Sequence, residues 1–284
     1  MTGFRAWRRR LQFGLPTVLG LEPRAFLIPY RYAATLPSAG SRAAYAPVEA
    51  AFELHRRQFT TYLEHMEGLR TELLAIGDRR APAPRWGQDW FPRLDGAAAY
   101  TMVRNHRPAR IVEIGSGHST RFFARAAQDG GLATAITAID PAPRAVLDGL
   151  DNVRIIRKTV QDAGAEPFAS LSAGDFLAID SSHILMPGSD VDLLLNHVLP
   201  SLPEGVFVHI HDVFLPDDYP TEWAWRGYNE QLGVAPLLTG NGWHPLFASH
   251  YVASRMGATL AGTVVEQLPL PEGAHESSLW LKKG

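Results

Sequence analysis

The sequence predicts an α/β fold, in which a Rossmann-like, doubly wound, mostly parallel sheet of seven strands follows an N-terminal helical extension. Three observations lead to this prediction. Short apolar runs of strand length alternate with helix-length segments beyond residue 86, as in a parallel sheet covered on both faces. One of these runs, residues 110–114, leads directly into a glycine turn and then a helix. Residues 46–76 carry apolar side chains at helical spacing instead.

The first strand, residues 110–114, shows the pattern most clearly: a short apolar run that ends in polar residues. Strands are expected at residues 110–114, 134–139, 153–157, 175–179, 205–210, 241–249 and 277–281. Helices are expected at 95–105, 119–128 and 222–232. Ligands of such open sheets bind beyond the carboxyl ends of the strands, so polar residues at these ends are the candidates for function.

A boundary between two parts is predicted after residue 85, because residues 81–84 read Ala-Pro-Ala-Pro and form a stiff linker. Residues 1–85 would form an arm and a long helix that covers the substrate or mediates oligomerisation, and residues 86–284 the ligand-binding domain. The helix over 46–76 has apolar positions four and three residues apart, the spacing of a coiled-coil seam. The seam comprises Val48, Phe52, His55, Phe59, Tyr62, Met66, Leu69, Leu73 and Ile76. It packs on the domain or pairs with a second subunit in a homodimer.

The first 30 residues combine arginines with apolar side chains. The arginines are Arg5, Arg8, Arg9 and Arg10. Prolines and charged residues interrupt the apolar run that follows, so neither a membrane span nor a secretory signal is expected, and the protein is expected in the cytoplasm. One interpretation is a peripheral anchor on anionic lipid, with Trp7 and Phe13 at the interface. The favoured alternative is an arm packed on the protein or on a partner subunit.

The glycine turn at residues 113–120 reads Glu-Ile-Gly-Ser-Gly-His-Ser-Thr. Gly115 and Gly117 allow a tight turn and a close approach to a ligand. A dinucleotide fingerprint would need a third glycine where Thr120 stands. S-adenosylmethionine carries no phosphate, and its sulfonium, amino acid end and ribose diol call for carboxylates, which Glu113 and Asp140 supply.

With Asp140 at the end of the second strand, this turn resembles the first motif of the class I S-adenosylmethionine-dependent methyltransferases. The resemblance extends over residues 86–284 and implies that the last two strands form an antiparallel pair at the edge of the sheet. It also implies that Asp140 accepts both ribose hydroxyls. The candidates for binding the cofactor are Glu113, Gly115, Ser116, Gly117, Ser119, Asp140 and Gln161.

A second group of polar residues follows the fourth and fifth strands. Asp180 ends the fourth strand with His183 three residues later, and Asp212 ends the fifth. His209 and His211 share one face of the fifth strand, where His209 is expected to be a packed residue. The two carboxylates could hold a divalent metal.

This arrangement resembles the metal-dependent O-methyltransferases of the catechol, caffeoyl-coenzyme A and macrocin types. The resemblance implies that Asp180 and Asp212 bind a metal that holds the hydroxyl of the substrate, and that His183, as a neutral histidine, removes its proton. Residue 211, often an acid in that family, is a histidine here, so His211 and Asn229 are both candidates for the third ligand. Magnesium, manganese, iron and zinc all remain open as the metal.

The sequence therefore predicts transfer of a methyl group from S-adenosylmethionine to a hydroxyl of a small metabolite, sugar or glycan. The aromatic segment 214–226 would form an acceptor wall or lid, or pack on the domain. A net charge of −2 argues against nucleic acid as a partner, and the absence of cysteine excludes a cysteine nucleophile. The alternatives are a metal-independent N- or carboxyl-methyltransferase and a non-catalytic S-adenosylmethionine-binding protein at a membrane surface.

Overall fold

The computed structural model describes residues 3–284, with side chains from residue 7 onward. It divides the chain into two compact units: Met1–Ala43 with Asp217–Tyr228, and Ala44–Pro216 with Asn229–Gly284. The division follows residue 43 instead of residue 85. The segment 44–85 therefore belongs to the same unit as the sheet.

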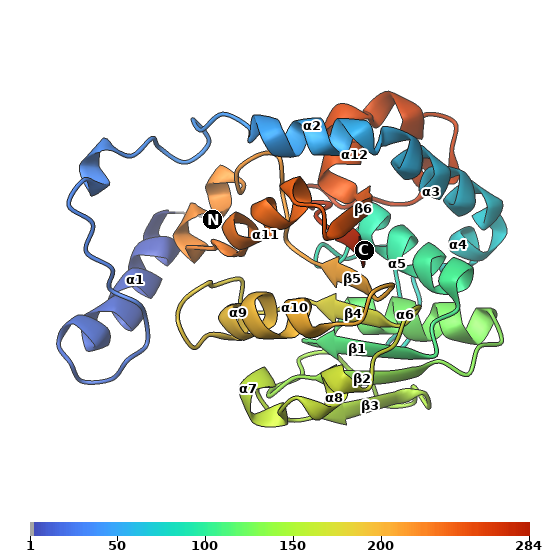
Figure 1. The fold of residues 1–284 in the computed structure, drawn as a ribbon, viewed down its shortest axis with the longest axis horizontal. Helices are drawn as coiled ribbons and strands as arrows, with labels where there is room; N and C mark the ends of the chain where they lie inside the picture. Colours follow the sequence, from blue (N-terminus) through green and yellow to red (C-terminus); the bar gives the residue numbers. More distant parts are fainter. Residues whose placement is uncertain (1–2) are drawn as a thin grey trace. The chain divides into compact units, whose positions relative to one another are not determined.

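The larger unit is built on a seven-stranded sheet in the order β3-β2-β1-β4-β5-β7-β6 (Figure 1). All neighbouring pairs are parallel up to β5, and β7 is antiparallel to both β5 and β6. This confirms the predicted fold class and the antiparallel pair at the edge. The strands are β1 (Arg110–Ile114), β2 (Ala135–Ile139), β3 (Val153–Ile156), β4 (Phe176–Ile179), β5 (Phe207–Ile210), β6 (Trp243–Ala248) and β7 (Leu279–Lys283).

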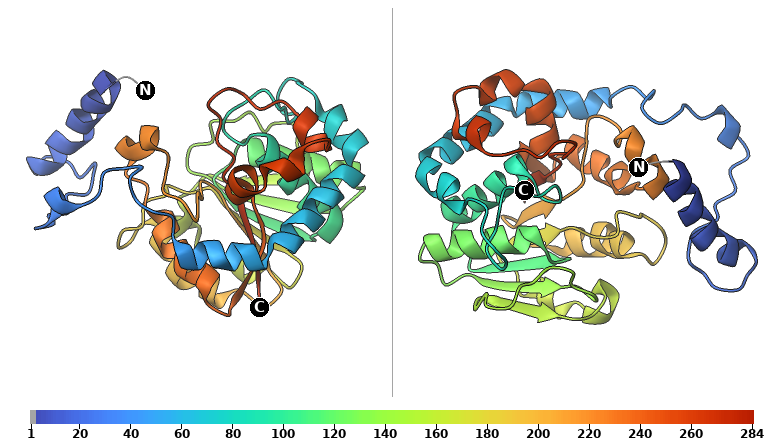
Figure 2. Two further views of the ribbon diagram at one scale, coloured as in Figure 1. Left: turned by 90° about the horizontal axis from the view of Figure 1, so that it is seen from above. Right: turned by 180° about the vertical axis from the view of Figure 1, so that it is seen from behind.

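Helices cover both faces of this sheet. The strand order reverses beside β1, and parallel crossovers are right-handed, so the connection from β1 to β2 lies on the face opposite the connection from β4 to β5 (Figures 1 and 2). The first connection is α6 (His118–Asp129), which packs against α5 (Arg93–His106). The second is a continuous run of α9 (Asp190–Leu193), the π-helix η2 (Leu194–Val198) and α10 (Leu199–Ser201). Between β3 and β4 lie α7 (Val160–Ala163) and α8 (Glu166–Ala169).

The remaining helices of the larger unit surround the antiparallel edge of the sheet. They are α2 (Ala46–Leu54), α3 (Arg56–Gly68), α4 (Arg70–Ile76), α11 (Glu230–Thr239), α12 (Ser249–Arg255), η4 (Gly257–Leu260) and α13 (Val264–Gln267). α3 packs on both β6 and α5, and α11 packs on α2.

The single long helix predicted over residues 46–76 is three helices, and that prediction was wrong in one respect. The chain bends at His55 and Leu69, whose φ angles of −103° and −106° leave the helical range. Both breaks fall on seam positions, and both side chains are only half-buried. The other seam residues are buried. The two bends therefore let the seam follow the curved surface of the domain.

The seam packs on its own domain. Phe59 lies 6.2 Å from Phe247 of β6 and 5.8 Å from Tyr251 of α12, measured between ring centroids, and all three rings are buried. Phe52 stacks edge-on against the same Tyr251 at 5.3 Å. These contacts account for the apolar side chains of the seam. The homodimer stays a prediction.

The smaller unit contains α1 (Gly3–Val18), η1 (Ala33–Thr35) and η3 (Thr221–Arg226). Arg42 forms an ion pair with Asp218 at 2.5 Å, and the guanidinium of Arg9 lies 4.7 Å from the ring of Trp225. The helix predicted over 222–232 ends early, because Gly227 adopts a left-handed conformation and α11 begins only at Glu230. Over the described part of the chain, no helix is both long enough and apolar enough to cross a bilayer.

Replacement of Phe59 by alanine tests the packing of the seam. Its side chain is fully buried among three aromatic rings. Phe59→Ala should therefore lower the free energy of unfolding by about 3–5 kcal/mol, as measured by urea denaturation. Leu54→Ala is the matched control, since Leu54 is 84% exposed and its loss should change stability by less than about 0.5 kcal/mol. A Phe59 variant as stable as the control would contradict this packing.

Candidate functional site

The glycine turn after β1 is held against β4 by a close backbone approach. Gly115 has a φ of +83°, and its N–H donates to the carbonyl of Ile139 at 2.9 Å. A Cβ at this position would collide with the backbone oxygen of Asp180. Glycine is required here for both its conformation and its lack of a side chain.

Glu113 organises the same turn from beneath. Its carboxylate is buried and accepts hydrogen bonds from the hydroxyls of Ser119, at 2.5 Å, and Thr120, at 2.6 Å. The Thr120 oxygen also accepts from the N–H of Gly117 at 2.9 Å. Thr120 therefore connects the turn to the strand. The sequence analysis noted only that Thr120 replaces a glycine of the dinucleotide fingerprint, and it did not predict this role.

Both carboxylate oxygens of Glu113 are engaged within the protein. Burial raises the pKa of Glu113 to about 8, although the two hydroxyl donors oppose the shift. Its direct contact with a cofactor, like that of Ser119, stays a prediction, whereas its contribution to the shape of the turn is visible in these hydrogen bonds.

Asp140, at the end of β2, lies beside the turn. One of its oxygens accepts from the Ser116 hydroxyl at 2.7 Å, and the other accepts from the N–H of Ala142 at 2.8 Å. The structure thus places Asp140 and Ser116 together at the carboxyl edge, and the binding of a ribose by Asp140 stays a prediction.

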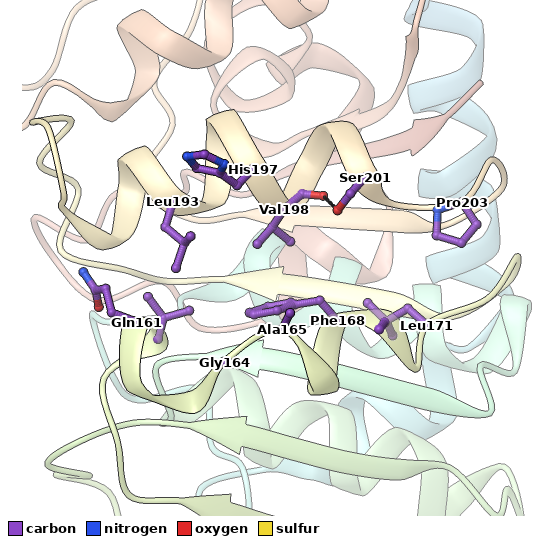
Figure 3. Close-up of a pocket in the computed structure, with 12 residues that line it drawn as sticks. Gln161, Gly164, Ala165, Phe168, Leu171, Leu193, His197, Val198, Ser201 and Pro203 are labelled. Atoms are coloured by element: carbon purple, nitrogen blue, oxygen red, sulfur yellow. Dashed lines mark hydrogen bonds between the residues drawn. The ribbon is translucent and has the colours of Figure 1, made fainter.

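The hydrogen bond of Gln161 lies outside the glycine turn. The residue lies on α7, and its side-chain amide donates to the carbonyl of Gly188 at 3.1 Å. It also lines a mainly apolar cavity of about 400 Å³, where Phe168 of α8 faces Leu193 and Val198 on the run from α9 to α10 (Figure 3). Its role in binding a cofactor stays a prediction.

The second group of predicted residues forms a ring of alternating charge at the ends of β4 and β5. His183 Nε2 lies 3.3 Å from the carboxylate of Asp180 and 3.4 Å from that of Asp212. His211 Nδ1 lies 3.6 Å and 3.5 Å from the same two carboxylates. We call Asp180, His183, His211 and Asp212 the histidine–aspartate ring. All four were predicted from the sequence, and the structure brings them together.

Two buried acids that the sequence analysis missed support this ring from behind. Glu230, the first residue of α11, accepts from His183 Nδ1 at 2.8 Å. Asp95 of α5 lies 3.3 Å from His211 Nε2 and accepts from the backbone N–H groups of Ser277 and Ser278. An acid in the alanine-rich helix 93–106 is a signal that could have indicated Asp95. Glu230 carries no comparable signal, because it meets His183 only through the tertiary fold.

The carboxylates determine the charge of the ring histidines. Burial alone would lower the pKa of His183, but Asp180, Glu230 and Asp212 outweigh it and raise the pKa well above its usual value. The carboxylates around His211 raise its pKa in the same way. Burial would raise the pKa of Asp180, yet the two histidines lower it below its usual range. The carboxylates therefore favour the imidazolium form of both ring histidines, and the role of a neutral His183 as a base stays a prediction.

We compared the chain with families of known proteins. Residues 112–213, which include the turn, Asp140 and the ring, match a family model described as a methyltransferase domain. Over these residues the chain is similar to known methyltransferase domains. Its strand order and glycine turn are those expected of a class I, S-adenosylmethionine-dependent enzyme. No curated protein matches the sequence.

Several solved structures are similar to this chain at low sequence identity. One is the S-adenosylhomocysteine-bound methyltransferase PaMTH1 of Podospora anserina, with 15% identity, a TM-score of 0.43 and coverage of 92% of this chain and 99% of that one. Another is CmcI in its apo form, with 14% identity, a TM-score of 0.42 and coverage of 75% and 83%. A third is an O-methyltransferase from Bacillus cereus with S-adenosylhomocysteine, with 15% identity, a TM-score of 0.31 and coverage of 53% and 66%.

The backbone is strained at the histidine–aspartate ring. His183 and Asp212 have φ angles of +61° and +56°, and Arg107 is the only other non-glycine residue with positive φ in the described chain. Such conformations cost about 1–3 kcal/mol each and persist where surrounding contacts impose them. The surrounding contacts here include the hydrogen bond from Ser277 to Asp212 at 3.3 Å.

The metal site predicted at Asp180, Asp212 and His211 stays a prediction. Among the residues that the structure describes, no group of three or more histidine or acidic side chains is arranged to hold a metal ion. The ring atoms pair with one another, and metal binding would require the ring histidines to be deprotonated. Asn229 is also committed elsewhere, since its side-chain amide bonds to both backbone groups of Leu185.

His209 is a structural residue, as expected. Its ring is buried 4.8 Å from that of Trp280, and Nε2 lies 2.9 Å from the Ser278 hydroxyl. Burial lowers the pKa of His209 to about 3, so it stays neutral.

Thr120→Val tests how the turn is held. The substitution would remove the donor to Glu113 and the acceptor for Gly117, so we expect the free energy of unfolding to fall by about 1–3 kcal/mol in urea denaturation. Thr61→Val is the control, because the Thr61 hydroxyl bonds only to its own helix at the surface. Equal stability of the two variants would show that the Thr120 hydroxyl does not anchor the turn.

Proposed function

We propose that the chain transfers the methyl group of S-adenosylmethionine to a hydroxyl group of a small metabolite, a sugar or a glycan end. One observation carries this proposal: Asp180 belongs to both parts of the site. Its backbone oxygen lies against Gly115 of the cofactor turn, and its side chain belongs to the histidine–aspartate ring. A methyl donor bound at the turn would therefore lie next to groups that can handle a proton.

The cofactor would bind at the carboxyl edge of β1 and β2. The turn from Gly115 to Gly117 would approach the amino acid end, and Asp140 would accept the ribose hydroxyls. Ser116 supports this role, since its hydroxyl already holds one oxygen of Asp140 in place.

The acceptor must lose a proton as it is methylated. An oxygen lone pair attacks the methyl carbon, the carbon–sulfur bond breaks, and the sulfonium becomes the thioether of S-adenosylhomocysteine. The hydroxyl proton would pass to His183 Nε2 when that histidine is neutral. Glu230 accepts the Nδ1–H of the same ring, so the lone pair of the neutral form lies on Nε2, the atom that faces Asp180 and Asp212.

The side chain of Asp180 is 43% exposed, whereas those of His183 and His211 are 5% exposed. Asp180 is thus the ring member that an acceptor hydroxyl would meet first. It would accept a hydrogen bond from that hydroxyl and orient it toward the methyl carbon.

The metal-assisted form of the reaction stays a prediction. A divalent metal bound by Asp180, Asp212 and His211 would lower the pKa of the acceptor hydroxyl, and it would require both histidines to be deprotonated. Turnover abolished by a chelator and restored by Mg²⁺ or Mn²⁺ would support that form. Turnover that a chelator leaves unchanged would support a metal-independent transfer to oxygen, nitrogen or carboxylate, and cofactor binding without turnover would support the non-catalytic alternative.

Isothermal calorimetry with S-adenosylhomocysteine tests the cofactor site. Asp140→Ala should weaken binding at least about tenfold, because hydrogen bonds to a charged carboxylate contribute about 1.5–3 kcal/mol. Asp148→Ala is the matched control, since Asp148 is an exposed acid on the same connection between β2 and β3. Unchanged affinity in Asp140→Ala would refute the ribose assignment, and absence of binding in the unmodified protein would refute the proposed function.

The pH dependence of methyl transfer tests His183 as the base. Because its pKa is raised, the neutral form appears only on the alkaline side, so kcat/KM should rise as the pH increases above 7. Glu230→Gln removes one of the carboxylates that raise this pKa, so the rising limb should move to lower pH. S-adenosylhomocysteine release from a panel of hydroxylated acceptors provides the measurement. Glu204→Gln, at an exposed position, is the control. An identical profile in Glu230→Gln would exclude His183 as the base.

A further inference from the structure

The first 43 residues differ in charge from the remainder of the chain. They contain seven arginines and one acid, Glu22, although the whole protein has a net charge of −2. We call residues 1–43 the arm. The side chain of Arg5 lies outside the described residues, and those of Arg8, Arg9 and Arg10 are exposed.

The helix α1 of the arm presents two different faces. Trp7, Leu11, Leu15 and Val18 follow one another at intervals of four, four and three residues, which places them on one side of the helix. Their side chains are between 43% and 61% exposed. We call these four residues the apolar stripe.

The other side of α1 packs within its own unit. Phe13 is half-buried, and the guanidinium of Arg9 lies 5.6 Å from its ring and 4.7 Å from the ring of Trp225. Arg9 and Phe13 therefore hold the helix with the apolar stripe directed elsewhere. At 100° per residue, Arg8 and Arg10 fall on either side of the stripe.

Apolar exposure continues beyond the helix. Phe26, Leu27 and Ile28 are 60–69% exposed in the extended segment that follows. Single exposed apolar residues are common, but a run of this kind in one short segment indicates a binding surface.

We propose that the arm binds the surface of an anionic phospholipid membrane. The apolar stripe and residues 26–28 would enter the boundary between headgroups and acyl chains, and Arg8 and Arg10 would contact lipid phosphates. The charge of the arm favours an anionic membrane. Two arms, each with seven arginines and one acid, would repel one another, which argues against binding to a second copy of this chain. The apolar stripe argues against nucleic acid. The helix would lie in the plane of the interface, since it is too short and too polar to span the bilayer.

Sedimentation of the full-length protein with vesicles tests the proposal independently of methyl transfer. The protein should bind vesicles of phosphatidylcholine mixed with phosphatidylglycerol and not those of phosphatidylcholine alone, and salt should weaken the binding. Arg8→Glu with Arg10→Glu should lower the vesicle affinity at least about tenfold. Arg79→Glu with Arg80→Glu is the matched control, because it makes the same change in net charge at exposed positions outside the arm.

A second pair of variants tests the apolar stripe. Leu11→Ser with Leu15→Ser should also lower binding at least about tenfold, whereas Leu54→Ser, at an 84% exposed position outside the arm, should leave it unchanged. Circular dichroism and S-adenosylhomocysteine binding would verify that each variant is folded. The proposal would be overturned if the vesicle affinity did not depend on lipid charge, or if both arm variants bound vesicles as tightly as the unmodified protein. A dimer in analytical ultracentrifugation that only the stripe variant dissociates would also overturn it, because it would assign the stripe to a second copy.

Discussion

The contact between Gly115 and the backbone of Asp180 is the constraint on which the site depends. Parallel pairing of β1 with β4 brings the two strand ends to one edge, and only a residue without a side chain lets the turn after β1 come so close to the end of β4. The cofactor turn and the histidine–aspartate ring are therefore adjacent because two strands are adjacent. Loops of independent conformation could not fix that geometry as firmly.

Buried charge is the second organising feature, and it is balanced locally. Four carboxylates, those of Asp95, Asp180, Asp212 and Glu230, surround the imidazoles of His183 and His211. Each buried acid has a cationic partner or several hydrogen-bond donors, which buried charges require. Removing one member would change the charge balance of all its neighbours, so the effects of substitutions in the ring on stability should not be additive.

The sequence predicted the strands and the ring because both depend on local pattern. Apolar runs that end in polar residues locate strand ends, and parallel topology then brings those ends together. This reasoning found Asp140, Asp180, His183 and Asp212 at one edge. It could not find Glu230, which reaches His183 through tertiary packing alone.

Other features were hidden for similar reasons. The bends at His55 and Leu69 leave the four-and-three spacing of the seam unchanged, so this spacing predicts a single helix. The role of Thr120 was missed because a motif comparison registers the absence of a glycine and not the two hydrogen bonds that the hydroxyl makes. The charge of the ring histidines depends on the number of carboxylates within a few ångströms, which a linear sequence does not give.

The buried carboxyl of Glu113 has a consequence for the working range of the enzyme. Its pKa of about 8 means that it holds a proton at neutrality and releases it on the alkaline side, where a negative charge would appear beneath the cofactor turn. The neutral form of His183 appears in the same direction of pH. The two groups thus titrate in the same direction: the alkalinity that frees the base also gives Glu113 the negative charge that a sulfonium donor favours. Catalysis through His183 would gain from both changes on the alkaline side, and the acidity of the acceptor would decide how much of it is ionised there.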